Sequence, residues 1–138
     1  MQIFYFTRTG NSKKVAEEIA NAKGIVANSI SDGKDWSGRI NFLKAGRSAA
    51  KRESLDVEHA EIERDGKIIV VFPVWANKLP PAIRGFMKKN NGTKVIAVAL
   101  SASSSLNEID QNNFTKVYEV KGKNVQAPKK LLSSNIEN

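Results

Sequence analysis

The sequence predicts a doubly wound α/β fold, a three-layer αβα sandwich built on a parallel sheet of about five strands. Its apolar runs are continuous rather than alternating, which indicates strands that are buried on both faces. These runs alternate with helical patterns, as they do in parallel βαβ units. The 138 residues contain no internal repeat and no interior linker, so we expect residues 1–138 to form a single domain.

The N-terminal half supplies the first two strands and two helices of this prediction. A short apolar and aromatic run at residues 3–6 predicts the first strand. Residues 12–22 carry small and aliphatic side chains at helical spacing, which predicts a helix. Residues 25–26, with Ile30, form a weaker strand candidate. The spacing of apolar residues predicts a second helix over residues 36–51.

The C-terminal half contains the two strongest strand candidates. Residues 68–72 are entirely apolar, and residues 95–100 form a second continuous apolar run. Pro80 and Pro81 suit the first turn of a helix between these strands. The remaining expected elements are one or two helical turns within residues 106–111, a strand over residues 114–120, and a short helix after Pro128 in a loose tail at residues 127–138.

The composition excludes several kinds of functional site. The chain contains no cysteine and a single histidine, His59, which rules out disulfides, thiolate zinc sites, iron–sulfur clusters and histidine metal clusters. We therefore expect no metal site. No apolar run is long enough to span a membrane, and no export signal precedes the first strand, so the expected location is the cytoplasm.

The charge balance is strongly basic. There are 22 basic and 14 acidic residues, a net charge of +8, and residues 70–138 hold ten basic residues against four acidic ones. Such an excess is typical of proteins with nucleic-acid or acidic partners. Nucleic-acid binding would place aromatic residues among the basic ones, and the tail from Lys121 to Asn138 has none. We therefore expect no nucleic-acid partner, and a docking surface for an acidic protein.

Three loops of unusual composition follow the expected strands. In a doubly wound sheet, ligands bind beyond the carboxyl ends of the strands. The loops at these ends are residues 7–12, residues 73–78 and residues 101–105. The main evidence for a binding site is that all three loops are expected at the same end of the sheet, where the strands have their carboxyl ends.

The first loop has the composition of a phosphate site. Its hydroxyl and amide groups can donate hydrogen bonds, Gly10 permits a tight turn, and the following helix offers unpaired N–H groups to an anion. A helix cap is the alternative, because threonine, asparagine and serine all favour that position. The loop has neither the Walker ending nor the dinucleotide glycine pattern. Its residues are Thr7, Arg8, Thr9, Gly10, Asn11 and Ser12.

The second and third loops can accommodate a planar ring. Trp75 can stack on an aromatic ligand, although it can also cover the edge of the core. The third loop consists of small polar residues that permit close backbone approach and hydrogen bonds to a ring edge; a flexible connector or a helix cap before Leu106 is the alternative. The candidate residues are Pro73, Val74, Trp75, Ala76, Asn77 and Lys78 in the second loop, and Ser101, Ala102, Ser103 and Ser104 in the third.

A longer pattern joins the first strand, the first loop and the first helix. It reads Ile3-Phe4-Tyr5-Phe6-Thr7-Arg8-Thr9-Gly10-Asn11-Ser12 and continues through Val15, Ala16 and Ile19. An apolar strand, a Thr-x-Thr-Gly-x-Ser loop and a helix with alanine and aliphatic residues resemble the N-terminal signature of the flavodoxin family. Ser12 stands where the family most often has threonine.

A second segment strengthens the resemblance. Pro73-Val74-Trp75, followed by Leu79-Pro80-Pro81-Ala82-Ile83-Arg84-Gly85-Phe86, is similar to the second flavin loop of the family and its helix. Many members carry a glycine near the position of Asn77. The resemblance covers roughly residues 1–100 and implies a five-stranded parallel sheet of order 2-1-3-4-5.

The resemblance implies non-covalently bound FMN and no catalytic residue of the protein's own, because the flavin carries the redox chemistry. The first loop would cradle the phosphate, residues 73–78 would line the isoalloxazine with Trp75 stacking on it, and residues 101–104 would meet its other side. The third loop lacks the second stacking aromatic that is common in the family, and residues 101–114 are short for a full helix. Both departures would leave the flavin more exposed.

The implied function is that of an electron carrier between a reductase and a redox partner protein. The alternative is an FMN-dependent reductase of a quinone, a porphyrinogen or a similar small molecule, and a related variant is the small flavodoxin-like activator of ribonucleotide reductase. The basic surface favours an anionic, fully reduced flavin. It therefore predicts a carrier that is less reducing than an acidic flavodoxin and that docks on an acidic redox partner.

Overall fold

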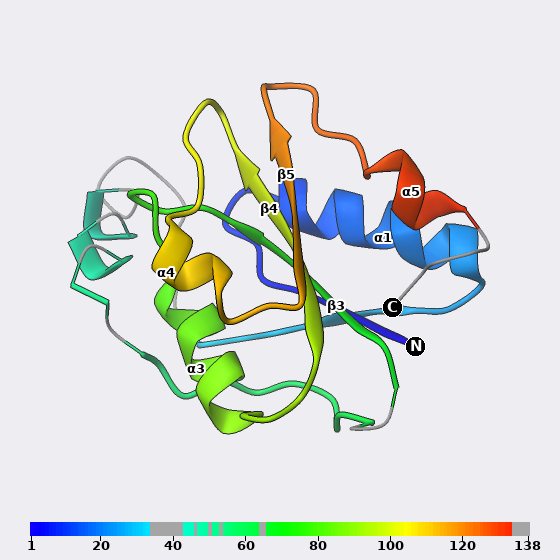
Figure 1. Ribbon diagram of the computed structural model, residues 1–138, viewed down its shortest axis with the longest axis horizontal. Coiled ribbons are helices and arrows are strands. Elements are labelled where there is room, and N and C mark those ends of the chain that lie inside the picture. Colours follow the sequence, from blue (N-terminus) through cyan, green and yellow to red (C-terminus); the bar gives the residue numbers. More distant parts are fainter. Residues whose placement is uncertain (34–42, 46, 50, 53, 64–65, 134–138) are drawn as a thin grey trace.

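A parallel sheet with helices on both faces forms the centre of the computed structural model, which describes residues 1–33, 43–45, 47–49, 51–52, 54–63 and 66–133 (Figure 1). The strand order is β2-β1-β3-β4-β5, and each neighbouring pair is parallel. The doubly wound fold class and the order 2-1-3-4-5 are therefore confirmed. The strands are β1 (Gln2–Tyr5), β2 (Ala27–Ser29), β3 (Ile68–Pro73), β4 (Val95–Ser101) and β5 (Lys116–Lys121), and the helices are α1 (Asn11–Lys23), α3 (Pro81–Lys89), α4 (Glu108–Gln111) and α5 (Lys129–Leu132).

The sheet is buried on both faces because successive residues of its central strands point to opposite sides. Ile68, Val70 and Phe72 of β3 belong to one core cluster, whereas Ile69 and Val71 belong to the other. None of these five side chains is more than 1% exposed. The continuous apolar runs of the sequence are therefore strands that are covered from both sides.

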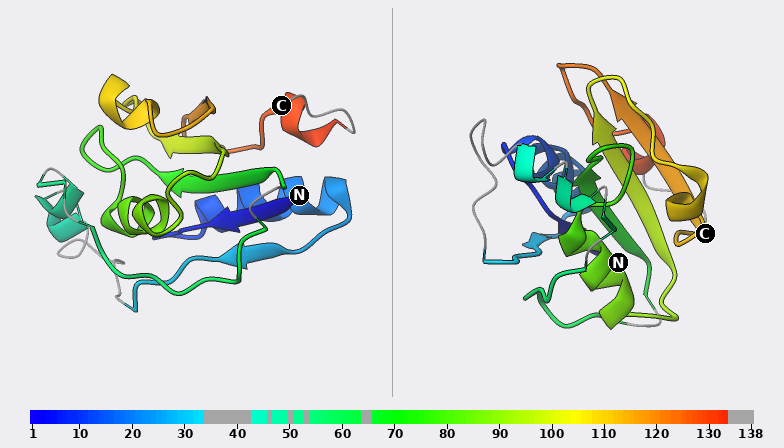
Figure 2. Two further views of the ribbon diagram at one scale, coloured as in Figure 1. Left: turned by 60° about the horizontal axis from the view of Figure 1, so that its bottom comes forward. Right: turned by 90° about the vertical axis from the view of Figure 1, so that its left-hand side faces the viewer.

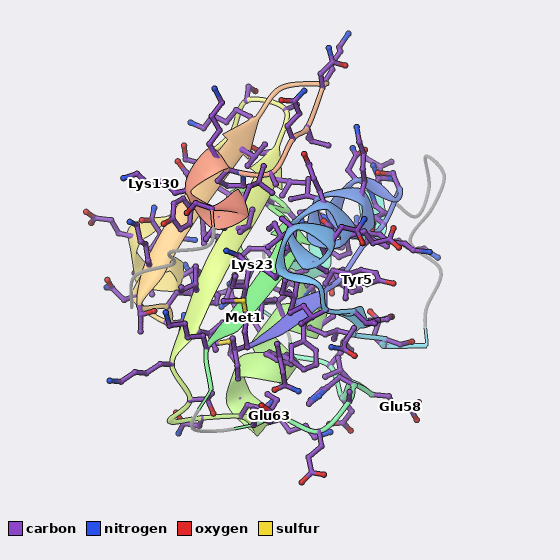
Figure 3. The ribbon with its side chains drawn as sticks, turned by 90° about the vertical axis from the view of Figure 1, so that its right-hand side faces the viewer. Met1, Tyr5, Lys23, Glu58, Glu63 and Lys130 are labelled. Atoms are coloured by element: carbon purple, nitrogen blue, oxygen red, sulfur yellow. The ribbon has the colours of Figure 1, made fainter. Side chains whose placement is uncertain are left out.

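Helices cover both faces of the sheet (Figures 1 and 2). Ile19 of α1 and Leu131 of α5 pack into one core cluster, and Figure 3 looks onto this face, with α1 and α5 side by side. Ile83 and Phe86 of α3 pack into the other cluster, together with Leu106 just before α4. None of the helices within the described ranges is long and apolar enough to cross a membrane.

The second strand differs from the sequence prediction. It spans Ala27–Ser29 rather than residues 25–26, and Val26 is 79% exposed. The reason is its place at the edge of the sheet, where a strand needs no apolar face. Backbone pairing with β1 fixes it instead, and the Asn28 side chain adds a hydrogen bond to the carbonyl of Ile3 at 3.2 Å.

The other expected elements are present with shifted ends. Residues 43–45 and 47–49 are helical, while residues 36–42, 46 and 50 of the helix expected over 36–51 lie outside the described part of the chain. The last strand, the helical turn before it and the short C-terminal helix appear as β5, α4 and α5.

The tail differs from the expectation that it is loose. As far as residue 133 it is packed, because Leu131 is fully buried and the Ala127 N–H donates to Oε1 of Glu18 at 2.8 Å. Residues 134–138 lie outside the described residues.

Candidate functional site

A pocket of about 500 Å³ lies at the carboxyl ends of β1, β3, β4 and β5. The loops after these strands line it, and Figure 1 shows those after β4 and β5 projecting from one edge of the sheet. The helix after β1 packs on one face and the helix after β3 on the other, so this is the switch point of the sheet. The volume falls within the range of about 300–1,000 Å³ that small-molecule sites occupy.

The first loop turns tightly into α1. Gly10 is the residue that caps this helix, and its φ of 99° is a left-handed conformation that favours glycine. Its N–H donates to Oγ1 of Thr7 at 2.8 Å, which closes the turn. Because glycine has no side chain, α1 begins without a side-chain cap. The polar residues of the loop therefore do not fill the cap position, and Asn11 and Ser12 line the pocket at this helix end.

The second loop contains a tight turn from Trp75 to Lys78. The N–H of each of these two residues donates to the carbonyl of the other, at 3.0 and 2.9 Å. Ala76 and Asn77 between them have φ angles of 52° and 61°, as a two-residue type I′ turn requires. Trp75 lines the pocket, but it is only 5% exposed and packs edge-on against Phe6 with ring centroids 5.5 Å apart. It is part of the core here, and its stacking on a flavin stays a prediction.

The third loop is tied to β5. The Ser101 hydroxyl donates to the carbonyl of Ser104, and Nζ of Lys121 donates to Oγ of Ser105 at 2.7 Å. The N–H of Gly122 donates to the Ser101 carbonyl at 3.0 Å. Several hydrogen bonds thus hold the small residues of this loop against the neighbouring strand.

The structure brings most of the predicted site residues together. Thirteen of the sixteen candidates line this one pocket, whereas Gly10, Asn77 and Lys78 do not. Gly10 faces a neighbouring hollow on the outer side of α1. Asn77 and Lys78 belong to the same turn as Trp75 and Ala76, which do line the pocket. Whether the thirteen residues contact a cofactor stays a prediction.

Four further residues line the pocket that sequence reasoning missed: Leu100, Gly122, Lys123 and Val125. Three of them lie in the loop after β5, at the same edge of the sheet as the other loops. The sequence does contain a signal for this fourth loop, because a Lys-Gly-Lys-Asn turn follows the last expected strand. The rule that placed the site beyond the carboxyl ends of the strands applies to this strand as well.

The lining of the pocket is cationic. Arg8 and Lys123 are its charged residues, and no acidic residue lines it among the described residues. The first turn of α1 contains no acidic residue either, so nothing there opposes the positive end of the helix dipole. The pocket is therefore suited to an anionic ligand.

A buried acid lies behind the second loop. Asp110 of α4 is 1% exposed, and Arg84 of α3 donates two hydrogen bonds of 2.8 and 2.7 Å to its carboxylate. The backbone N–H of Leu79, which directly follows the turn, donates to Oδ2 of Asp110 at 3.1 Å. Burial raises the pKa of Asp110, but hydrogen bonds from Arg84, Asn107 and Leu79 and the charge of Arg84 outweigh it and hold the pKa below its ordinary value of 3.8.

The fold recurs in solved structures of flavoproteins. A candidate flavoprotein from Bacteroides uniformis ATCC 8492 is 23% identical, with a TM-score of 0.69 over 95% of this chain and 93% of that one. A flavoprotein from Lactobacillus acidophilus NCFM, crystallised in complex with FMN, is 19% identical, with a TM-score of 0.69 over 86% of this chain and 91% of that one. No protein-family model and no curated protein matches the chain. The likeness shows a common flavodoxin-like fold over nearly the whole chain.

Proposed function

We propose that the chain binds FMN in this pocket and carries electrons between a reductase and a redox partner protein. The observation that carries the proposal is that the three predicted loops, together with the loop after β5, line one pocket at the switch point of the sheet. The flavoprotein of the same fold that was crystallised with FMN supports the choice of ligand.

The phosphate of FMN would be held by the first loop. Thr7, Thr9 and Ser12 offer hydroxyl groups, and the backbone N–H groups at the start of α1 offer further donors. The positive end of the helix dipole stabilises a phosphate dianion at this position. Arg8 adds a full positive charge to the same side of the pocket.

The isoalloxazine ring would lie between the second and third loops. Pro73 to Ala76 of the second loop and Ser101 to Ser104 of the third loop line the pocket. The third loop contributes only small side chains, so backbone and hydroxyl groups can approach the polar edge of the ring. Trp75 supports the opposite wall from within the core.

Bound FMN supplies reversible one- and two-electron chemistry, and the protein binds it, orients it and sets the charge around it. Arg8 and Lys123 would stabilise the negative charge that reduction places in the pocket. We therefore propose a less reducing carrier than an acidic protein of this fold would be. The positive charges of Arg8 and Lys123 would also attract an acidic redox partner to this end of the sheet.

A second function, reduction of a quinone or a similar small molecule, is favoured by one observation. Ala102 and Ser103 of the third loop are exposed, and no aromatic residue between Ser101 and Asn113 covers the pocket. A substrate could then approach the ring face directly.

The visible absorption spectrum tests the central proposal. The purified protein is incubated with FMN, free flavin is removed by gel filtration, and the spectrum is recorded. Flavin bands that coelute with the protein, with quenched flavin fluorescence, are the expected result. A protein that stays colourless after this treatment would refute FMN binding.

Turnover with NADPH separates the two functions. A reductase oxidises NADPH steadily with a quinone when it is the only protein present. The proposed carrier should do so only after a flavin-dependent NADPH reductase is added, because a carrier receives its electrons from a reductase and not directly from NADPH. Steady turnover without the reductase would favour the second function.

A further inference from the structure

We propose that Asn107 is a positioning residue for the cofactor loop, because it clamps the Trp75–Lys78 turn in the shape that forms the pocket wall. The proposal rests on the proposed FMN site. Asn107 does not line the pocket and comes about 30 residues after the turn, so it would act through Asn77 rather than by touching the cofactor.

The turn that Asn107 holds has an unfavourable backbone conformation. Ala76 and Asn77 are consecutive residues with φ angles of 52° and 61°. This is the left-handed region of backbone conformation, which residues other than glycine seldom adopt. Such residues persist where the surrounding structure fixes them. Since Ala76 lines the pocket, the backbone conformation of the turn determines the shape of this part of the pocket wall.

Asn107 makes two hydrogen bonds to the tip of this turn. Its backbone N–H and its side-chain Nδ2 both donate to the carbonyl of Asn77, at 3.0 and 2.8 Å. The chain leaving the turn is held at a second point, where the Leu79 N–H donates to Oδ2 of Asp110 at 3.1 Å. Both holding groups belong to the start of α4, so the tip and the exit of the turn share one support.

The support itself is firmly fixed. Asp110 is buried and bound to Arg84 of α3 by two hydrogen bonds, and Arg52 Nη1 contacts its Oδ1 at 2.8 Å. Asn107 is joined to this cluster because its Nδ2 also donates to Oδ2 of Asp110 at 2.8 Å. The clamp therefore connects the turn to α3 and α4, which lie on the same face of the sheet.

Helix capping accounts for only part of what the Asn107 side chain does. Its Oδ1 accepts from the Asp110 N–H at 3.0 Å, which is an ordinary N-cap contact. Serine, threonine or aspartate could make this contact too. Only an amide can also donate two hydrogen bonds, one to the turn and one to the buried carboxylate.

The Asn107→Ser variant separates these two roles. Serine keeps an N-cap acceptor but removes the Nδ2 group, and with it the hydrogen bonds to the Asn77 carbonyl and to Oδ2 of Asp110. Only the first of these touches the turn, so we expect the FMN dissociation constant, measured by quenching of flavin fluorescence, to rise about fivefold, as the loss of that neutral hydrogen bond predicts. A thermal melt of the protein without FMN checks that the fold is retained, and Asn107→Thr, which also keeps the cap, replaces the serine variant if it is not.

Two further variants make the test specific. Asn113→Ser is the matched control, because Nδ2 of Asn113 donates to the Asp110 carbonyl at 3.0 Å but does not touch the turn. Its FMN affinity should stay that of the wild type. Asn77→Gly, combined with Asn107→Ser, should restore most of the affinity, because glycine adopts the left-handed conformation without strain. A loss caused only by weakening α4 would not be rescued at position 77.

Amide hydrogen exchange of the protein without FMN tests the clamp independently of the cofactor. We expect the N–H groups of Lys78 and Leu79 to exchange faster in Asn107→Ser than in the wild type and in Asn113→Ser. Unchanged exchange at both amides, or equal losses of FMN affinity in the two serine variants, would overturn the proposal. If the wild type bound no FMN while these amides responded as expected, the proposed function would fail and the clamp would stand as a structural device.

Discussion

Arg84 and Asp110 form a bidentate ion pair that joins α3 to α4, with Nη1–Oδ1 and Nη2–Oδ2 distances of 2.8 and 2.7 Å. Arg52 contacts the same carboxylate at 2.8 Å, but its side chain is 37% exposed, against 13% for Arg84. The two arginines therefore differ in solvent screening although they share one acid. This difference makes their contributions to stability separable.

We expect Arg84→Gln to lower the free energy of unfolding by about 3 kcal/mol, since it breaks a buried pair and leaves Asp110 poorly compensated. Arg52→Gln should cost about 1 kcal/mol or less, because water screens the more exposed pair. Urea unfolding followed by circular dichroism measures both values. Equal losses in the two variants would contradict the assignment of Arg84 as the main partner.

The lowered pKa of Asp110 predicts a loss of stability in acid. A carboxyl whose pKa is lower in the folded than in the unfolded state stabilises the fold above its ordinary pKa, here 3.8, and this contribution is lost as the pH falls through the folded value. Urea midpoints between pH 5 and pH 2.5 should therefore fall less steeply in Asp110→Asn than in the wild type. Glu108→Gln, at an exposed position of the same helix, is the control and should retain the wild-type slope.

For a glycine in α3, we predict a change in stability on substitution by alanine that is opposite to the one expected from helix propensity. A Cβ atom on Gly85 would lie 1.7 Å from the carbonyl oxygen of Leu55, because the connecting segment crosses the helix at this point. Glycine to alanine usually stabilises a helix by about 1 kcal/mol, but we expect Gly85→Ala to destabilise the protein by about 3 kcal/mol or more. Gly66→Ala, where the nearest atom is 3.4 Å away, should change stability little. A Gly85→Ala variant as stable as the wild type in urea would show that the segment can shift at no cost.

The sheet was predictable because both of its faces are buried. Residues 68–72 and 95–100 are continuously apolar, and short runs of this kind are typical of strands that are buried on both faces. The edge strand β2 was harder, since backbone pairing rather than side-chain burial fixes Ala27–Ser29. The three loops could be found for a related reason, because their composition differs from that of ordinary connections and they follow recognisable strands.

The support behind the pocket could not be found in this way. In α4 the acid Asp110 is buried, whereas Ile109 is 68% exposed, which reverses the usual pattern of a short helix. The partners of Asp110 lie 26 and 58 residues away in the sequence, at Arg84 and Arg52. One sequence offers no way to pair residues so far apart, and the role of Asn107 depends on the same pairing.

The first loop provides a test of phosphate recognition. Thr7→Val removes the hydroxyl that accepts the Gly10 N–H at 2.8 Å while keeping the shape of the side chain. We expect FMN to bind about fivefold more weakly and riboflavin, which has no phosphate, to be almost unaffected. Titrations of both flavins by fluorescence quenching measure the two constants. Thr115→Val, at the other end of the sheet, controls for the loss of a hydroxyl elsewhere. Equal weakening of FMN and riboflavin would place the phosphate away from this loop.

The charge at the mouth of the pocket predicts the direction of a change in redox potential. Lys123 lines the pocket, and no acidic residue does so among the described residues. One positive charge several ångströms from the ring contributes about 1 kcal/mol to stabilising added negative charge, which corresponds to about 40 mV for one electron. Lys123→Gln should therefore lower the midpoint potential of bound FMN by about that amount, and Lys123→Glu should lower it further.

A redox titration in the presence of reference dyes measures the shift. Lys94→Gln is the matched control, because this exposed lysine precedes β4 at the opposite end of the sheet and should leave the potential unchanged. Raising the salt concentration should shrink the difference between Lys123→Gln and the wild type, since ions screen an exposed charge. If neither substitution at Lys123 moved the potential, the cationic lining would have to act on binding alone, and the proposal of a less reducing carrier would lose its structural basis.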